Sequence, residues 1–243
     1  MDYSFLQCGE GALTVHLGDG IDPAINRRVT ALQGAIVSAG LRGITDLIPA
    51  YADLTVCYDC TVISAKALQR QLRRLLDSLS VAGQDRRRVF QLPVCYGGDY
   101  GPDLDFVCHH SGLSAQEVIE LHSAPDYLIY MLGFLPGFAY LGGLDPRLHT
   151  PRLDSPRTCI PAGSVGIGGA QTGVYPLASP GGWQLLGRTP VSVFDRQRQE
   201  PILYRAGDLV HFVPISPAEY EKIARAVAAG TYTVQVEEVP VCD

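Results

Sequence analysis

Lysine, tryptophan and long apolar runs are scarce in this 243-residue sequence. Only Lys66 and Lys222 are lysines among 19 basic residues, a bias better explained by genome composition than by function. The net charge of −6 argues against a general role in nucleic-acid binding. No apolar run reaches the roughly 18 residues of a membrane-spanning helix, and the N-terminal segment lacks the basic start and apolar stretch of a secretory signal. The seven cysteines are scattered along the chain, which favours reduced thiols and a cytoplasmic protein. Because the chain also lacks an apolar span, we expect no membrane partner.

Two short motifs that suggest cofactor chemistry are incomplete. Cys57 and Cys60 have the spacing of a metal-binding pair, but a zinc site needs four ligands and the sequence has no second pair. The glycine run at 163–173, GSVGIGGAQTG, has no Gly-Lys-Ser/Thr, and Gln171 stands where a dinucleotide-binding loop has its third glycine. The run is compatible with tight β-turns or with a backbone cradle for an anion, and both interpretations stay open.

The first 86 residues show the alternation of a small α/β domain. Asp22 followed by Pro23 predicts the start of a helix that Gly40 ends, and Ser64 predicts the start of a second helix. The order of strand, helix, strand, strand and helix resembles a ferredoxin-like sandwich that lacks one strand. The strands of this pattern are predicted at 12–17, 44–51 and 53–59.

The remainder of the chain has a different pattern. The polar stretch 83–88 predicts a linker, and residues 87–214 predict a β-barrel or sandwich, because short apolar runs alternate with glycine and proline turns. A helix that opens at Ser216, and the strand after it, are the elements that the first domain lacks. We therefore expect an α+β protein in which residues 215–243 return to complete the N-terminal domain.

Three arginines follow prolines at five-residue intervals, at positions 147, 152 and 157. Proline fixes its own φ and restricts the residue before it, so each guanidinium leaves a stiff stretch of backbone and loses less entropy when it binds. Such a group suits a carboxylate or a phosphate. A structural ion pair with Asp145, Asp154 or another carboxylate is an equally good use, and the sequence does not decide between them.

Two further residues in this part of the chain are candidates for chemistry. Asp103 and Ser114 predict the caps of two short helices, Ser114 with Glu117 at capping-box spacing, and His122 stands at the end of the second helix. A neutral imidazole there suits proton transfer near neutral pH. Trp183 is the only tryptophan, and in a turn-rich β region it predicts either a core anchor or the wall of a pocket.

The motifs GFLPGFAYLGGL, TPRLDSPR, IPAGSVGIGGAQTGVYP and SPGGWQLLGRTP, in this order, closely resemble the KipI-like family, also described as the PxpB component of 5-oxoprolinase. The resemblance is densest from Leu92 to Pro214 and departs at Ala139, where proline is expected. It implies a ferredoxin-like α/β domain plus a cyclophilin-like β-barrel domain. It also implies a complex with two further components, the KipA-like PxpC and PxpA, that converts 5-oxoproline to glutamate, using ATP with Mg at the level of the complex.

The resemblance leaves two alternative functions: a KipI-type inhibitor of a sensor histidine kinase, and the carboxyltransferase component of a urea-carboxylase-like enzyme. Under the leading hypothesis we expect an anion and substrate site on the barrel rim, shared with PxpC. The candidate catalytic residues are His122, Arg152 and Arg157. The candidate substrate- or anion-binding residues are Gly166, Gly168, Gln171, Thr172, Tyr175 and Arg188.

Overall fold

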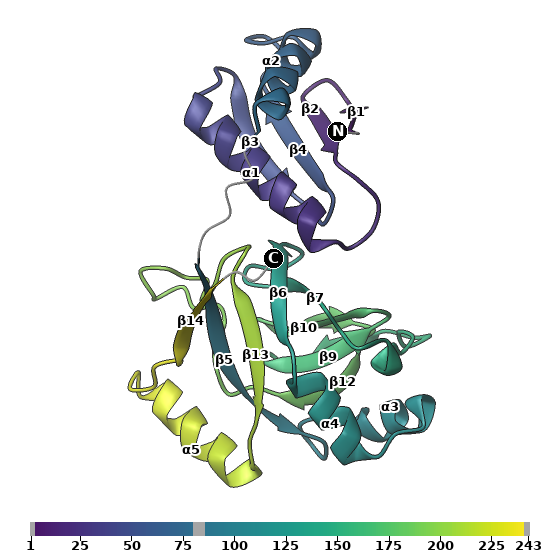
Figure 1. The fold of residues 1–243 in the computed structure, drawn as a ribbon. Coiled ribbons are helices and arrows are strands. Elements are labelled where there is room, and N and C mark those ends of the chain that lie inside the picture. Colours follow the sequence, from purple (N-terminus) through teal and green to yellow (C-terminus); the bar gives the residue numbers. More distant parts are fainter. Residues whose placement is uncertain (1–2, 80–85, 241–243) are drawn as a thin grey trace. The chain divides into compact units, whose positions relative to one another are not determined.

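The computed structural model describes residues 3–79 and 86–240. The chain divides into two compact units, Met1–Asp85 and Arg86–Asp243 (Figure 1). In the described residues, no helix combines the length and apolar character needed to cross a membrane. Each unit has its own hydrophobic core, so each is described by itself.

The first unit is a four-stranded antiparallel sheet in the order β1-β2-β4-β3, with helices α1 (Pro23–Ala39) and α2 (Ala65–Asp77). Leu54, Val56 and Tyr58 alternate with half-buried residues and face the core, as the period of two in the sequence predicts. The strands are β1 (Ser4–Cys8), β2 (Ala12–His16), β3 (Ile44–Pro49) and β4 (Asp53–Tyr58).

The fourth strand of this sheet comes from the N-terminal side of the unit, and not from residues 215–243. Strand β1 pairs with β2 through a hairpin and occupies the edge of the sheet. The helix α5 (Pro217–Ala228) and the strand β14 (Val236–Pro240) belong to the second unit, where β14 pairs with β5. The prediction that the tail completes the N-terminal domain was therefore wrong.

The second unit is built on a closed ring of strands in the order β12-β9-β10-β7-β6-β13-β5, which the pairing of β12 with β5 completes. The pairs are antiparallel except β13 with β5. The ring strands are β5 (Arg86–Tyr96), β6 (Asp126–Leu132), β7 (Ala139–Gly142), β9 (Ser164–Gly168), β10 (Gln171–Val174), β12 (Gln184–Arg188) and β13 (Leu209–Pro214).

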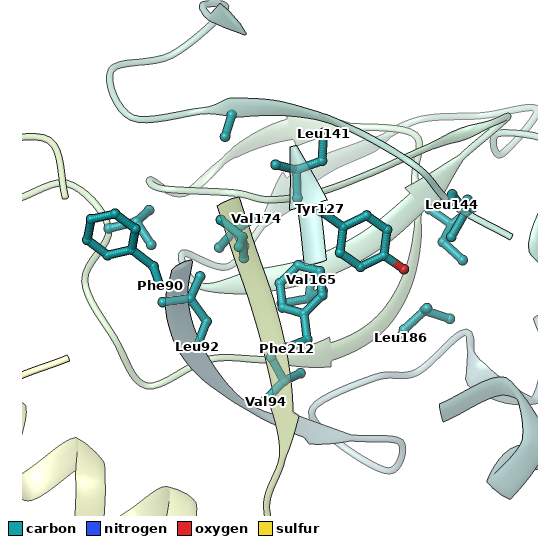
Figure 2. Close-up of a cluster of buried hydrophobic side chains, with 14 of the residues drawn as sticks. Phe90, Leu92, Val94, Tyr127, Leu141, Leu144, Val165, Val174, Leu186 and Phe212 are labelled. Atoms are coloured by element: carbon teal, nitrogen blue, oxygen red, sulfur yellow. The ribbon is translucent and has the colours of Figure 1, made fainter. Parts of the chain in front are cut away.

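Strand β5 organises the ring because it has three partners: β13 on one edge, and β14 and β12 along the other. Its residues Phe90, Leu92 and Val94 point into the same interior as Phe212 of β13 (Figure 2). The predicted linker at 83–88 falls partly on residues 80–85, outside the described residues. Its last part, Arg86–Arg88, is the beginning of β5.

Three helices accompany the ring: α3 (Leu104–Ser111), α4 (Ala115–Ser123) and α5. The capping box predicted for Ser114 and Glu117 is confirmed, with Ser114 Oγ accepting from Glu117 N. Asp103 occupies the predicted N-cap position of α3, but its carboxylate makes no capping bond and bonds elsewhere in the barrel. A short 3₁₀ turn and a small separate sheet complete the unit: η1 (Pro146–Leu148), β8 (Arg157–Ile160) and β11 (Ser179–Gly181).

Candidate functional site

Hydrogen bonds hold the backbone on both sides of Arg152. Thr150 and Gly169 exchange two backbone hydrogen bonds, at 3.3 and 2.8 Å. The side chain of Gln184 donates from Nε2 to the Pro151 carbonyl at 3.0 Å. Beyond the arginine, Leu153 N donates to the Gly182 carbonyl at 2.7 Å. The stiff mounting that the Pro-Arg motif predicts is therefore reinforced by hydrogen bonds on either side of Arg152.

A cluster of aromatic rings lies beneath this segment. Phe138, Tyr175 and Trp183 contact one another edge to face, with ring centroids 5.5 to 5.9 Å apart. This is the geometry that aromatic pairs prefer, because the positive edge of one ring meets the negative face of the next. All three rings are at least 95% buried as residues. They form a rigid wall of a kind suited to a flat ligand.

Glycines make room for this wall. A Cβ at Gly168 would overlap the indole of Trp183, and a Cβ at Gly181 would stand 2.6 Å from the Tyr175 hydroxyl. Neither glycine has a positive φ, so close approach is what requires them. Gly166 is similar, because a Cβ there would lie 2.7 Å from the Gln184 carbonyl. The glycine run is therefore explained by packing and by the β9–β10 hairpin.

The guanidinium of Arg152 stands over the ring of Trp183, with Cζ 6.0 Å from the centroid, which is the outer limit of a cation–π contact. Within residues 3–79 and 86–240, no carboxylate is paired with it. Arg152 and the rings border a pocket of about 140 Å³. The lining residues are Phe134, Phe138, Tyr140, Arg152, Tyr175, Pro180, Gly181, Gly182 and Trp183. We call this the aromatic pocket.

The size of the aromatic pocket limits what enters it. Its volume is well below the roughly 300–1,000 Å³ of sites that hold drug-sized ligands. The lining carries one charge, the Arg152 cation, beside the phenol of Tyr175. Burial raises the pKa of the Tyr175 phenol, so the hydroxyl stays protonated at neutral pH and is able to donate a hydrogen bond. The pocket is suited to a small, flat anion.

The other two Pro-Arg arginines are engaged in ion pairs. Arg147 pairs with Asp145 at 2.7 Å on the surface. Arg157 pairs with Asp103 at 2.7 Å, and the second oxygen of Asp103 accepts from Leu185 N. This pair ties β8 to the start of α3 and to β12, and it explains why Asp103 does not cap its helix. Arg157 thus has a structural use, and the geometry does not bring it into the aromatic pocket.

His122 lies in the barrel core and makes a continuous chain of hydrogen bonds. Tyr96 Oη is 2.8 Å from Nδ1, and Thr172 Oγ1 is 2.7 Å from Nε2. Thr172 also donates to the Gly166 carbonyl at 3.0 Å. The self-consistent assignment has Tyr96 donating to Nδ1 and Nε2–H donating to Thr172, which leaves the imidazole neutral.

The surroundings of His122 reinforce the neutral form. The ring is fully buried and stacks on Phe212 with centroids 4.9 Å apart, and its centroid is 5.7 Å from that of Tyr127. Burial lowers the pKa of His122 to about 3. Thr172 is also fully buried, so its hydroxyl serves this network and does not line the aromatic pocket. The geometry favours a structural role for both residues.

The remaining predicted residues are dispersed. Tyr175 lines the aromatic pocket, as described above. Gln171 begins β10 and pairs with Gly168 in the hairpin. Arg188 donates from Nε to the Ala162 carbonyl at 2.9 Å and borders a different hollow of about 220 Å³ beside Tyr220 of α5. Of the nine candidates, the structure brings Arg152 and Tyr175 together in the aromatic pocket, with Gly168 supporting its wall.

Sequence reasoning missed Gln184, which is 2% exposed and holds the Pro151 carbonyl. Its Oε1 is buried without a partner in the described part of the chain. Gln184 follows Trp183 in the motif SPGGWQLLGRTP, so the motif includes it among residues of interest. Its role could not be predicted, because its partner Pro151 is 33 residues away in the sequence. Phe134 and Phe138 lie in the motif GFLPGFAYLGGL, which indicates the family but does not assign either residue to a pocket.

Comparison with known proteins places this architecture in a family. The family model described as "Carboxyltransferase domain, subdomain C and D" matches residues 3–204, and the chain belongs to this family. The chain is 42% identical over 228 residues to a Bacillus subtilis protein named as the B subunit of 5-oxoprolinase, covering 90% of this chain and 95% of that protein. It is 46% identical over 207 residues to a protein of the same name from Escherichia coli O157:H7, covering 85% and 93%.

The fold also matches a much longer protein. The solved structure of urea carboxylase from Kluyveromyces lactis superposes with a TM-score of 0.82 at 23% identity. The match covers 98% of this chain and 24% of that one. At this identity the likeness concerns the fold alone. It agrees with the predicted α+β class with a cyclophilin-like barrel, which is confirmed together with the relationship to the KipI-like, PxpB proteins.

Proposed function

We propose that this chain is the PxpB component of an ATP-dependent 5-oxoprolinase complex, and that the aromatic pocket holds the lactam substrate. The observation that carries the proposal is Arg152, a cation without a carboxylate partner in the described residues, which stands over the indole of Trp183 and lines a small pocket. 5-Oxoproline is a flat five-membered ring that carries one carboxylate. The names of the relatives, which describe the B subunit of 5-oxoprolinase, support the same assignment.

In this proposal each part of the pocket has a task. The planar guanidinium of Arg152 binds the carboxylate through two parallel hydrogen bonds, which a lysine cannot form. The faces and edges of Phe138, Tyr175 and Trp183 receive the ring. The fixed backbone on both sides of Arg152 means that little entropy is lost when the carboxylate binds. The chain thereby orients a substrate whose amide resists hydrolysis through resonance.

ATP and Mg do not fit the aromatic pocket. About 140 Å³ is too small for a nucleotide, and the lining residues include no carboxylate to hold the metal. In the described residues there is also no cluster of three or more His, Cys, Asp or Glu side chains arranged for a metal. We therefore propose that the nucleotide is held by a partner protein of the PxpA or PxpC type, and that this chain contributes substrate binding.

The single tryptophan makes the proposal testable on the purified full chain. Trp183 lines the aromatic pocket, so a bound ligand should change its fluorescence. We expect 5-oxoproline to change the emission saturably, and 2-pyrrolidone, the same lactam without the carboxylate, to bind much more weakly. Arg152→Lys should weaken 5-oxoproline binding by about tenfold or more, the equivalent of losing a charged hydrogen bond of about 1.5–3 kcal/mol.

The Pro-Arg motif supplies matched controls for this experiment. Arg147→Lys changes an exposed, paired arginine and should leave the affinity unchanged. Arg157→Lys should lower the melting temperature through the Asp103 pair, with the affinity of the folded protein unaltered. Absence of a saturable response in the wild-type chain, or an equal affinity in Arg152→Lys, would contradict the proposed function.

A further inference from the structure

Phe134 has a backbone conformation that a phenylalanine rarely adopts. Its φ is +62°, and it is the one residue other than glycine with positive φ in the described parts of the chain. Leu135 N donates to the Gly133 carbonyl at 2.6 Å, which closes a three-residue turn around Phe134. A γ-turn with positive φ at its centre is rare and strained. The strain lies on the loop between β6 and β7, at the edge of the aromatic pocket.

The surrounding loop holds this conformation in place. Gly133 N donates to the Phe138 carbonyl at 3.1 Å, and Phe138 N donates to the Leu135 carbonyl at 2.9 Å. These bonds close the base of the loop. The Phe134 ring meets Phe138 edge to face, with centroids 5.6 Å apart and planes at 86°. The ring is therefore an outer extension of the cluster formed by Phe138, Tyr175 and Trp183.

The exposure of Phe134 shows that core packing does not explain the strain. The residue is 66% exposed, more than Phe106, the other exposed phenylalanine of the described chain. It lines the aromatic pocket on one side and an open apolar hollow of about 260 Å³, beside Ile202, on the other. A strained residue that buries little of its own surface is typical of a functional position, because the rest of the fold must hold it there.

We propose that Phe134 is a binding residue that closes the aromatic pocket over the ring of the bound lactam. The inference rests on the proposed function, since it concerns the same pocket and the same substrate. Arg152 binds the carboxylate at one side of the pocket, and the Phe134 ring covers the apolar part of the ligand at another. The strained turn holds the ring edge to face against Phe138, where it lines the aromatic pocket.

Two small substitutions separate the ring from the backbone. Phe134→Ala and Phe134→Gly both remove the ring, but only glycine adopts positive φ without strain. The glycine variant should therefore melt about 2–4 °C above the alanine variant. Both should weaken 5-oxoproline binding by about tenfold in the Trp183 fluorescence titration, as expected for an aromatic contact and its buried area. Phe134→Tyr keeps the ring and should restore the wild-type affinity.

Each alternative result has a distinct meaning. Unchanged affinity in both small variants, with weakened binding in Arg152→Lys, overturns the role of Phe134 and leaves the proposed function intact. The role of Phe134 is also overturned if both small variants bind 5-oxoproline with unchanged affinity but no longer assemble with the partner proteins. The exposed ring would then belong to a protein interface. A glycine variant that melts no higher than the alanine variant overturns the strain argument. No binding of 5-oxoproline by the wild-type chain removes the proposed function and this inference together.

Discussion

His122 and Arg152 lie in the same unit, and they differ in how their hydrogen-bonding capacity is met. Both ring nitrogens of His122 have partners inside the core, and the network ends at a backbone carbonyl. The guanidinium of Arg152 has an aromatic ring below it and no carboxylate partner in the described residues. A polar group that is buried and fully bonded stabilises a fold, whereas a fixed and unpaired charge at a pocket mouth is available to a ligand.

The largest effect is expected from removal of the His122 imidazole. His122→Ala should lower the free energy of unfolding of the second unit by about 3–5 kcal/mol, because it opens a cavity, removes the acceptor of the Tyr96 hydroxyl and removes the donor to the Thr172 hydroxyl. Chemical denaturation followed through Trp183 measures this unit specifically, since the only tryptophan lies there. His211→Ala is the control, because His211 pairs with Asp126 on a more exposed face. A free energy of unfolding unaffected by His122→Ala would restore the catalytic hypothesis for His122.

The pH dependence of the second unit tests the same network without a mutation. The pKa of His122 is about 3 in the folded chain against 6.5 as the ordinary value, so the unfolded chain binds more protons between these limits. Stability from this group is fully present above pH 6.5 and is lost as the pH falls. Between pH 7 and pH 5 the loss should be about 2 kcal/mol. Urea titrations at both values, followed through Trp183, measure it, and a flat profile would contradict the buried neutral ring.

A smaller effect is expected at Gln184, which acts on the pocket through Arg152. Gln184→Met keeps the length of the side chain, removes the bond to the Pro151 carbonyl and also removes the unpartnered Oε1. The melting temperature should change little, because these two effects oppose each other. The dissociation constant for 5-oxoproline should rise about threefold, in keeping with one neutral hydrogen bond. A lower melting point with unchanged affinity would assign Gln184 to the fold alone.

The sequence predicted those features that neighbouring residues determine. Asp22, Ser64, Ser114 and Ser216 all accept hydrogen bonds from the first turns of their helices, because a helix cap is formed within a few positions. The strand β1 was not predicted, because four of its five residues are exposed and the strand lacks the alternation of buried and exposed residues that identifies a half-buried strand. The partner of the C-terminal strand was assigned wrongly because strand pairing between distant segments leaves no local pattern.

The candidate site shows the same limit. The Pro-Arg motif predicted stiffly mounted arginines, but Arg157 finds its acid 54 residues away, at Asp103. Nothing near Arg157 in the sequence distinguishes it from Arg152. Likewise, His122 carries the signals of an accessible helix-end histidine, and residues 26 and 50 positions away enclose it. Which polar group is left free for a ligand is a property of the assembled barrel.

The three partners of β5 have a consequence for how the protein is made. Strand β5 begins at residue 86, and its partner strands are synthesised later. The last of them, β14, ends at residue 240. A ribosome adds about 5–20 residues per second, so this interval lasts on the order of 10–30 s. During that time Phe90, Leu92 and Val94 stand on an eleven-residue strand without its native neighbours. The newly made chain is therefore exposed to aggregation at β5 during this interval, and we expect a chaperone that shields this strand during synthesis to raise the yield of folded protein.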